Sequence, residues 1–231
     1  MDQTALFEFD SSQTAFINAS DEIDVEIQAS KAIVSYWQED LDRILSHSNL
    51  RLLFDFPTET ATIPFYYDAL HQLIYVFPYA CASIAAGTID RLAALGVKEV
   101  LIYGHCFNLD LSSGLLVSSA LRDEGTSFHY MAPTRYVDAD NDLFRRCQQY
   151  ILQNALVYET GRVWTTDAIY RLTSRKIEAY KKEGCKAVDQ ETSAYYAVAQ
   201  FRQVQACRFL TQQYDESWMS HALAILTHEK D

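Results

Sequence analysis

The sequence predicts a single α/β domain, residues 1–231, in which helices flank a mixed central β-sheet. Short apolar runs alternate with amphipathic segments along most of the chain, as is typical of strands buried beneath helices. Gly96 and Gly184 stand where two helical patterns end, and glycine most readily takes the left-handed conformation that follows a helix. No internal repeat or low-complexity linker divides the chain, so we expect one domain.

The first half of the chain predicts two helices and three strands. One helix is expected within residues 24–45, because four large apolar residues recur there at helical spacing. They are Ile33, Trp37, Leu41 and Ile44. The strands are expected at 50–56, 73–77 and 97–103, and the second helix at 83–95. These strands are short continuous apolar runs, which favours a mainly parallel sheet covered on both faces.

The second half predicts that the sheet is mixed. Two strand patterns, residues 114–120 and 126–130, follow each other without a helix between them. Further strands are expected at 157–165, 185–188 and 206–211. Helices are expected at 142–156, at 173–183, from 192 onward and at 216–228. Asp140 or Asn141 is expected to cap the helix at 142–156, because short polar side chains accept hydrogen bonds from first-turn amides.

Composition and charge argue against several kinds of function. The formal net charge is −12, which disfavours binding to nucleic acid or to an anionic membrane. The five cysteines are odd in number and form no Cys-x-x-Cys pair, so neither a disulfide framework nor a zinc site is expected. The N-terminus lacks a signal-peptide pattern, and no stretch approaches the ~20 apolar residues of a membrane span. We expect a cytoplasmic protein without a metal ion or a bound cofactor.

Polar residues follow several of the predicted strands. Gly104 and His105 come after the strand at 97–103, Glu191 follows the strand at 185–188, and Asp215 follows the last strand. Ligands of such sheets bind outside the carboxyl ends of the strands, so the sequence predicts a site there. Glu191 and Asp215 each have a second interpretation, as the N-cap of the helix that follows.

Two segments carry a resemblance to a known family. The first contains Thr165-Thr166-Asp167, Tyr170 and, after a lysine-rich helix, Asp189-Gln190-Glu191. The second is Arg122-Asp123-Glu124-Gly125-Thr126-Ser127, followed by Phe128 and the pair His129-Tyr130. From about residue 50 to residue 218, the chain resembles the nucleoside phosphorylase family, which includes uridine phosphorylases and hexameric purine nucleoside phosphorylases.

The resemblance implies a pentosyltransferase. Such an enzyme converts a (deoxy)ribonucleoside and inorganic phosphate, its co-substrate, reversibly to a base and a pentose 1-phosphate. Glu191 matches the family's glutamate that holds the ribose hydroxyls, and Gln190 replaces the methionine that packs on the sugar. Ile169 and Thr126 are also expected to contact the nucleoside or nucleobase. The family further implies a homo-oligomer, either a dimer or a trimer of dimers.

The position that protonates the base has two alignments. Without a gap, Tyr214 stands at the family's base-protonating aspartate, whereas one inserted residue places Asp215 there. We favour Asp215 as the catalytic residue, because its sequence Asp-Glu-Ser-Trp resembles the exit from the last strand in relatives. Neither the Ser-Asp pair of purine-specific relatives nor the Gln-x-Arg pattern of uridine-specific relatives is present, so both base classes stay open.

The expected phosphate site departs from the family pattern. Relatives use a Gly-x-x-Gly turn, but here the turn reads Gly104-His105-Cys106-Phe107, so a bulky ring replaces the second glycine. Gly104 and His105 are the residues left to contact phosphate. We therefore expect weak phosphate binding and slow or absent phosphorolysis. The alternatives to a phosphorylase are a nucleoside hydrolase and a non-catalytic nucleoside-binding protein.

Overall fold

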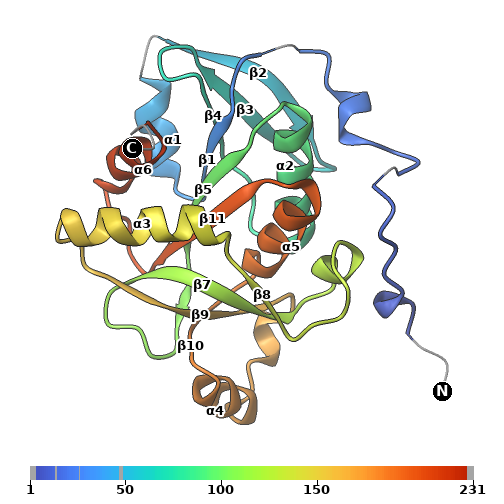
Figure 1. Cartoon of the computed structure of the whole chain (residues 1–231), viewed down its shortest axis with the longest axis vertical. Helices are drawn as coiled ribbons and strands as arrows, with labels where there is room; N and C mark the ends of the chain where they lie inside the picture. The colour runs from blue at the N-terminus through green and yellow to red at the C-terminus, as the bar shows by residue number, and fades with distance from the viewer. Residues whose placement is uncertain (1–3, 14, 26, 47–48, 228–231) are drawn as a thin grey trace.

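One twisted sheet organises the chain (Figure 1). The computed structural model describes residues 4–13, 15–25, 27–46 and 49–227. The strands are β1 (Lys31–Ser35), β2 (Leu50–Pro57), β3 (Thr62–Asp68), β4 (Leu73–Val76), β5 (Glu99–His105), β6 (Phe107–Asn108), β7 (Gly114–Asp123), β8 (Tyr136–Asp138), β9 (Tyr158–Thr166), β10 (Cys185–Asp189) and β11 (Gln205–Thr211). Their order is β2-β3-β4-β1-β5-β11-β7-β9-β10-β6, with β8 paired to β7.

The directions of the strands confirm a mixed sheet. β1 lies parallel between β4 and β5, and β5 is parallel to β11. β11 then pairs antiparallel with β7, and β7, β9 and β10 run parallel to one another. At the other edge, β2, β3 and β4 form an antiparallel meander.

Helices cover both faces of the sheet, as predicted. They are α1 (Gln38–Leu45), α2 (Ala82–Ala94), α3 (Asn141–Gln153), α4 (Ser174–Lys182), α5 (Thr192–Arg202) and α6 (Trp218–Thr227). Buried residues of α2 and α5 share one core cluster, whereas those of α1, α3 and α6 share the cluster on the opposite face. α4 stands apart at the lower end of the molecule, against β9 and β10 (Figure 1). Within the described residues, no helix is long and apolar enough to cross a membrane.

The sheet folds back on itself at one end. After β5, only Cys106 intervenes before β6, and the Cys106 amide donates to the Thr211 carbonyl at 3.1 Å. β6 then pairs antiparallel with β10, through Phe107 opposite Val188. Because β6 continues β5, this pairing brings the carboxyl end of β10 close to the carboxyl ends of β5 and β11.

The helix predicted within residues 24–45 is only partly correct. Residues 38–45 form α1, but Lys31–Ser35 form β1, hydrogen-bonded on both sides. Ile33 and Ile44 do face the same core cluster, so the shared apolar face is real although it spans a strand and a helix. The pairing with β4 and β5 outweighs the local helical spacing. Glu26 lies outside the described residues.

Other differences concern short elements. Residues 126–130, predicted as a strand, instead form the 3₁₀ helix Thr126–His129, in which the Tyr130 amide donates to the Ser127 carbonyl. The sequence did not reveal β3, β6 or β8. β3 contains Pro64, which argues against an inner strand; β4 pairs only from Phe65 onward, so the proline lies where that side of β3 is open. The closing helix ends at Thr227, and the predicted position His228 lies outside the described residues.

Asp140 caps α3; it is one of the two residues, Asp140 and Asn141, that were predicted as the cap. Its Oδ1 accepts from the amides of Asp142 and Leu143 at 3.0 and 2.9 Å, and from Gln205 Nε2 at 3.0 Å. We expect Asp140→Ala to lower the free energy of unfolding by about 1–2 kcal/mol in urea titrations, since it removes a helix cap. Asp142→Ala is the control: among the described residues the Asp142 side chain pairs with exposed Arg145 alone, so its loss should cost about 0.5 kcal/mol. Equal losses for the two variants would contradict the capping role.

Candidate functional site

Arg208 lies in the middle of β11 and is wholly buried. Along this strand, Ala206 and Leu210 face the core cluster beneath α2 and α5, whereas Cys207 and Phe209 face the opposite cluster. Since side chains alternate along a strand, Arg208 points to the side of α5. Its exposed fraction is 0%. A buried guanidinium is costly unless it is paired, so charged partners must meet it there.

Two carboxylates supply those partners. Arg208 Nη2 donates to Glu191 Oε2 at 2.7 Å, and Arg208 Nη1 lies 3.3 Å from Asp189 Oδ2. The rings of Tyr36 and Tyr195 flank the guanidinium, with their centroids 5.2 and 5.4 Å from Cζ. The two tyrosine hydroxyls are hydrogen-bonded at 2.6 Å. We call Asp189, Glu191 and Arg208 the buried charge cluster; it joins β11 to the carboxyl end of β10.

Burial and charge act in opposite directions on this cluster. Burial alone would lower the pKa of Arg208, but Asp189 and Glu191 outweigh it and raise the pKa, so the guanidinium stays charged. Burial raises the pKa of Glu191; Arg208 acts to lower it, and nearby Asp189 adds to the rise. Glu191 is therefore easier to protonate than an exposed glutamate and depends on Arg208 for its charge.

Gly104 provides the space for the guanidinium. The strand predicted at 97–103 was expected to end before Gly104. Instead, β5 continues through Gly104 to His105, in register with β11. A Cβ atom at position 104 would lie only 2.7 Å from Arg208 Nη2 and 3.4 Å from the Tyr36 ring. Gly104 was expected to contact phosphate, but the space beside it is occupied by the side chain of Arg208.

Asp189, and not Glu191, caps α5. Asp189 Oδ2 accepts from the Thr192 amide at 3.1 Å and from its hydroxyl, while Oδ1 accepts from Thr165 Oγ1 at 2.7 Å. Glu191 occupies the N-cap position, yet its side chain makes no capping hydrogen bond. The interpretation of Glu191 as a helix cap is therefore wrong. Its carboxylate, 4% exposed, points to Arg208 instead.

The turn that carries Thr126 lies near Glu191. Glu124, two residues before Thr126, accepts from Ser193 Oγ at 2.8 Å and so attaches the turn to the first turn of α5. The Gly125 amide donates to Asp167 Oδ2 at 2.8 Å, which attaches the same turn to the end of β9. Thr126 is half-buried there, close in the fold to the carboxyl end of β10.

Gln190 and Ile169 lie differently. Gln190 is half-buried between the two acids of the buried charge cluster. Ile169 packs with Trp164 and Leu121 on the face of the sheet covered by α4, whereas the buried charge cluster lies on the face covered by α5. The fold therefore brings Thr126 and Gln190 toward Glu191 but directs Ile169 elsewhere.

Asp215 and Tyr214 also lie apart from the buried charge cluster. The Asp215 amide donates to Tyr103 Oη at 2.8 Å, and Tyr158 Oη donates to Asp215 Oδ2 at 3.5 Å. Both tyrosines belong to the core on the opposite face of the sheet. Asp215 Oδ1 accepts from the Ser217 amide at 2.9 Å and so holds the turn that leads into α6. The Tyr214 hydroxyl donates to buried Asp40 at 2.9 Å.

His105 belongs to the same side as these tyrosines. Its side chain is exposed, and its ring lies 5.9 Å from that of Trp37, which packs on Tyr103. Gly104 faces Arg208 on the other side of β5. The two predicted phosphate contacts therefore point to opposite faces of one strand. Within the described residues, no group of three or more His, Cys, Asp or Glu side chains is placed to hold a metal ion.

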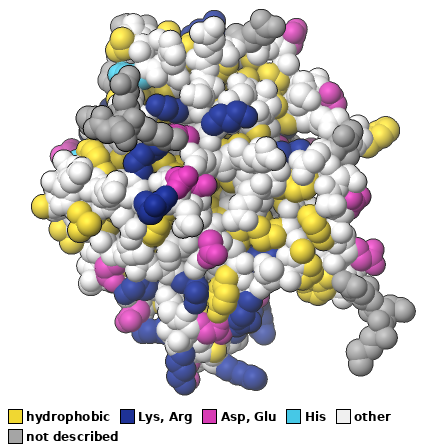
Figure 2. Space-filling view, in the orientation of Figure 1, with side chains coloured by type: hydrophobic (Ala, Val, Ile, Leu, Met, Phe, Trp, Pro, Cys, Tyr) yellow, Lys and Arg dark blue, Asp and Glu magenta, His cyan; other side chains and the backbone are white. Residues whose placement is uncertain are grey.

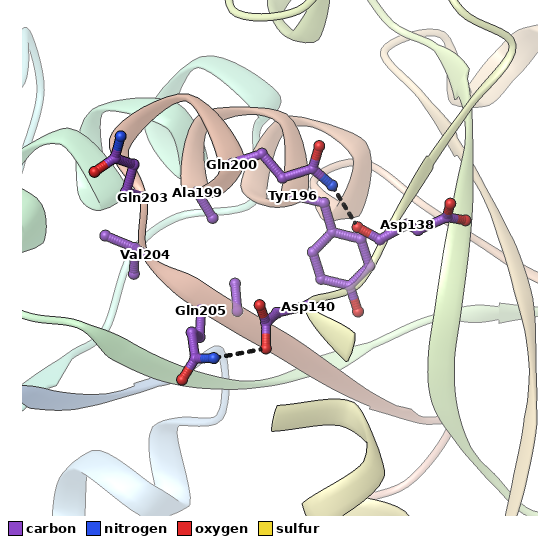
Figure 3. Close-up of a pocket in the computed structure, with 9 residues that line it drawn as sticks. Asp138, Asp140, Tyr196, Ala199, Gln200, Gln203, Val204 and Gln205 are labelled. Carbon is purple, nitrogen blue, oxygen red and sulfur yellow. Dashed lines mark hydrogen bonds between the residues drawn. The ribbon is translucent and has the colours of Figure 1, made fainter. Parts of the chain in front are cut away.

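Two hollows lie near the ends of β11. Asp215, Tyr158, Thr211 and Gln212 border an open hollow of about 450 Å³ at its carboxyl end. A cavity of about 290 Å³ lies between the end of α5 and the start of α3, where Gln200 bonds the Asp138 carbonyl and Gln205 bonds Asp140 (Figure 3). Tyr196, Ala199 and Gln200 of α5 line this cavity, and Tyr196 lies five residues after Glu191, or about 7.5 Å along the helix at 1.5 Å per residue. None of the predicted site residues lines it.

The sequence profile of the Phosphorylase superfamily matches residues 32–216, from β1 to the turn before α6. The chain belongs to this superfamily. The resemblance inferred from the two motif segments is thereby confirmed. A DeoD-type 1 purine nucleoside phosphorylase of Shewanella oneidensis is 24% identical over 127 residues, which cover 53% of this chain and 54% of that protein. The chain thus spans about half the length of this curated relative.

Two solved structures show a similar fold. An AMP nucleosidase of Bacteroides thetaiotaomicron superposes with a TM-score of 0.71 at 19% identity, covering 86% of each chain. A uridine phosphorylase of Vibrio fischeri superposes with a TM-score of 0.70 at 18% identity, covering 94% of this chain and 92% of the other. The predicted single α/β domain with a mixed sheet is therefore confirmed.

Sequence reasoning missed Arg208. The signal was present, because Arg208 is the single charged residue in the otherwise mostly apolar run 205–211. A charge inside a buried strand must find a partner, and the predicted strand at 185–188 is followed by two acids. What the sequence did not provide was the closure of the sheet through β6, which brings β10 close to β11.

We expect Gly104→Ala to destabilise the protein by about 1–3 kcal/mol, because the added methyl group would overlap the paired guanidinium. Urea unfolding of the purified variant measures this loss. Gly125→Ala is the matched control: a Cβ atom there would meet nothing nearer than 3.8 Å, and φ is −87°. If Gly104→Ala lowers the free energy of unfolding no more than Gly125→Ala does, the Arg208 side chain moves aside without destabilising the protein.

Arg208→Met should destabilise the protein by about 3–5 kcal/mol, because Asp189 and Glu191 would be left buried without a counter-charge. Adding Glu191→Gln to this variant should recover part of the lost free energy of unfolding. A double-mutant cycle of urea titrations would measure this recovery. Arg202→Met is the control, since its partner Asp90 is less enclosed. Additive losses at positions 191 and 208 would contradict the coupling.

Proposed function

We propose that this chain cleaves the N-glycosidic bond of a nucleoside with water, rather than with phosphate, as the acceptor. The observation that carries the proposal is the position of Arg208 between Asp189 and Glu191, against Gly104. A resident side chain fills the space where a phosphate ion would approach the strand. The proposal keeps the nucleoside chemistry of the superfamily and changes the acceptor.

The charges support this choice of acceptor. Arg208 is already paired with two carboxylates, so the formal charge of the cluster is one negative unit. A phosphate dianion needs a surplus of positive charge and close backbone amides. Beside Gly104, the charge of Arg208 is already matched by Asp189 and Glu191, and the exposed Phe107 stands where the second glycine of the turn was expected. Water carries no charge and meets no such barrier.

Glu191 is the residue we propose to bind the sugar. An ionised carboxylate has about four acceptor positions, so the bond from Arg208 to Oε2 leaves capacity for ribose hydroxyls. Arg208 would act as a positioning residue that fixes the carboxylate and keeps it ionised. We propose that Gln190, the neighbour of Glu191 in sequence, and Thr126, on the turn that Glu124 attaches to the start of α5, contact the nucleoside. Positive charge that develops on the sugar would be stabilised by the net negative cluster.

A second candidate is a nucleoside-binding protein without catalysis. The position of Asp215 favours it, because the contacts of Asp215 lie on the face of the sheet opposite to Glu191. No acid is then assigned to protonate the departing base. The low exposure of Glu191 favours it as well, since a substrate must displace neighbouring side chains to reach the carboxylate.

We expect the purified protein to release base from at least one riboside in phosphate-free buffer, as measured by chromatography over a panel of purine and pyrimidine nucleosides. Added phosphate should not raise the rate, and the sugar product should be free pentose. Glu191→Gln should weaken riboside binding roughly 10- to 150-fold, the equivalent of a lost charge-assisted hydrogen bond. Binding of free bases should change little. Glu178→Gln, at an exposed position of α4, is the control.

The alternatives give different results in the same assay. Phosphate-dependent release with pentose 1-phosphate as the product would overturn hydrolysis in favour of phosphorolysis. Thermal stabilisation by ribosides without base release would favour the non-catalytic candidate. Equal losses for ribosides and free bases in Glu191→Gln would show that Glu191 serves the fold alone.

A further inference from the structure

Basic side chains gather around α4, although the protein as a whole is acidic. Figure 2 shows Lys and Arg side chains concentrated at the lower end of the molecule, where Figure 1 places this helix. Beside α4 lies a groove of about 620 Å³. Its lining residues are Ala168, Arg171, Thr173, Arg175, Lys176, Ala179 and Tyr180.

Two of the cations in this groove have no internal partner. Arg171 and Arg175 are exposed, and their side chains make no hydrogen bond or ion pair with any described residue. Every other arginine except Arg51 makes a hydrogen bond through its side chain. Lys176 is neutralised by Asp123, at 2.7 Å. The groove therefore presents two positive charges that the protein itself does not balance.

The backbone adds to this positive potential. α4 begins at Ser174 and runs for nine residues, with Thr173 as its N-cap. Thr173 Oγ1 accepts a hydrogen bond from the Lys176 amide. The aligned peptide dipoles leave partial positive charge at this end of the helix. Both free guanidinium groups belong to residues within three positions of the helix start. A multiply charged anion would meet side-chain and backbone donors at one place.

The opposite part of the groove is apolar. Ala179 and Tyr180 line it one turn further along α4. The Tyr180 ring is fixed from behind by Trp164, edge to face at 4.7 Å between centroids. Glu178, the one acid of this helix, is not among the lining residues. A ligand with a charged group and a flat apolar part would match both ends of the groove.

We propose that the α4 groove binds a phosphate monoester carried on a small ring. A monoester is close to a dianion at neutral pH, which matches the two unbalanced guanidinium groups, and each planar guanidinium can donate two bonds to one phosphate. The ring would lie against Tyr180 and Ala179. The groove lies on the α4 face of β9 and β10, so this site is separate from Glu191 and does not depend on the proposed reaction.

Titration calorimetry with phenyl phosphate tests the proposal. The full-length protein should bind one equivalent, and the double variant Arg171→Gln/Arg175→Gln should lose affinity by roughly tenfold or more, as expected for lost charge-assisted bonds. Arg51→Gln is the matched control, because the Arg51 side chain is also exposed and makes no hydrogen bond with any described residue. Glu191→Gln should leave this binding unchanged. Inorganic phosphate should bind more weakly than phenyl phosphate because it lacks the ring.

Several results would overturn the proposal. Among them are no saturable binding by the wild-type protein, equal binding by the double variant, or the same loss in Arg51→Gln. Loss of phenyl phosphate binding in Glu191→Gln would place the ligand in the other site. If the double variant changes the oligomeric mass and the wild type binds no phenyl phosphate, the groove instead holds the acidic surface of a second copy. Thermal unfolding of each variant shows that it is folded.

Discussion

A single ion-pair network, the guanidinium of Arg208 with the carboxylates of Asp189 and Glu191, constrains the centre of this molecule. β11, which carries Arg208, and β10, which ends at Asp189, are separated in the sheet by β7 and β9. They meet only because β6 continues β5 and pairs with β10. In a low-dielectric interior, each member of this network is costly alone, so the closure of the sheet and the pairing of the charges depend on each other.

Much of the fold could be predicted because it follows local rules. Apolar runs located most of the strands, glycines located two helix ends, and Asp140 was one of two expected caps for α3. The spacing of apolar residues predicts a helix over β1, because the strands that pair with it, β4 and β5, are distant in sequence. The position of Glu191 at the carboxyl end of a strand could be inferred from the strand order, but its bond to Arg208 could not, since that contact depends on how far the sheet twists and closes.

The candidate site was predicted as a group of residues at strand ends, and the structure divides that group. Glu191 and Gly104 meet at Arg208, whereas Asp215 and His105 lie with aromatic side chains on the other face of β5 and β11. The reason is the alternation of side chains along a strand, which sends neighbours such as Gly104 and His105 to opposite faces. Positions adjacent in sequence at a strand end therefore need not serve one ligand. Charge is divided as well, with acids around Arg208 and unbalanced cations around α4.

The contact between Gly104 and Arg208 also restricts the order in which this sequence can change. A larger residue at 104 costs less stability once position 208 has become shorter, because a Cβ atom at 104 would otherwise lie 2.7 Å from Arg208 Nη2. A shorter, uncharged residue at 208 in turn leaves two buried acids without a counter-charge until one of them has also been replaced. A single substitution at position 104 or 208 therefore gives a less stable protein. A lineage that acquired this arginine would therefore retain it, with glycine opposite, long after the selection that introduced it had ended.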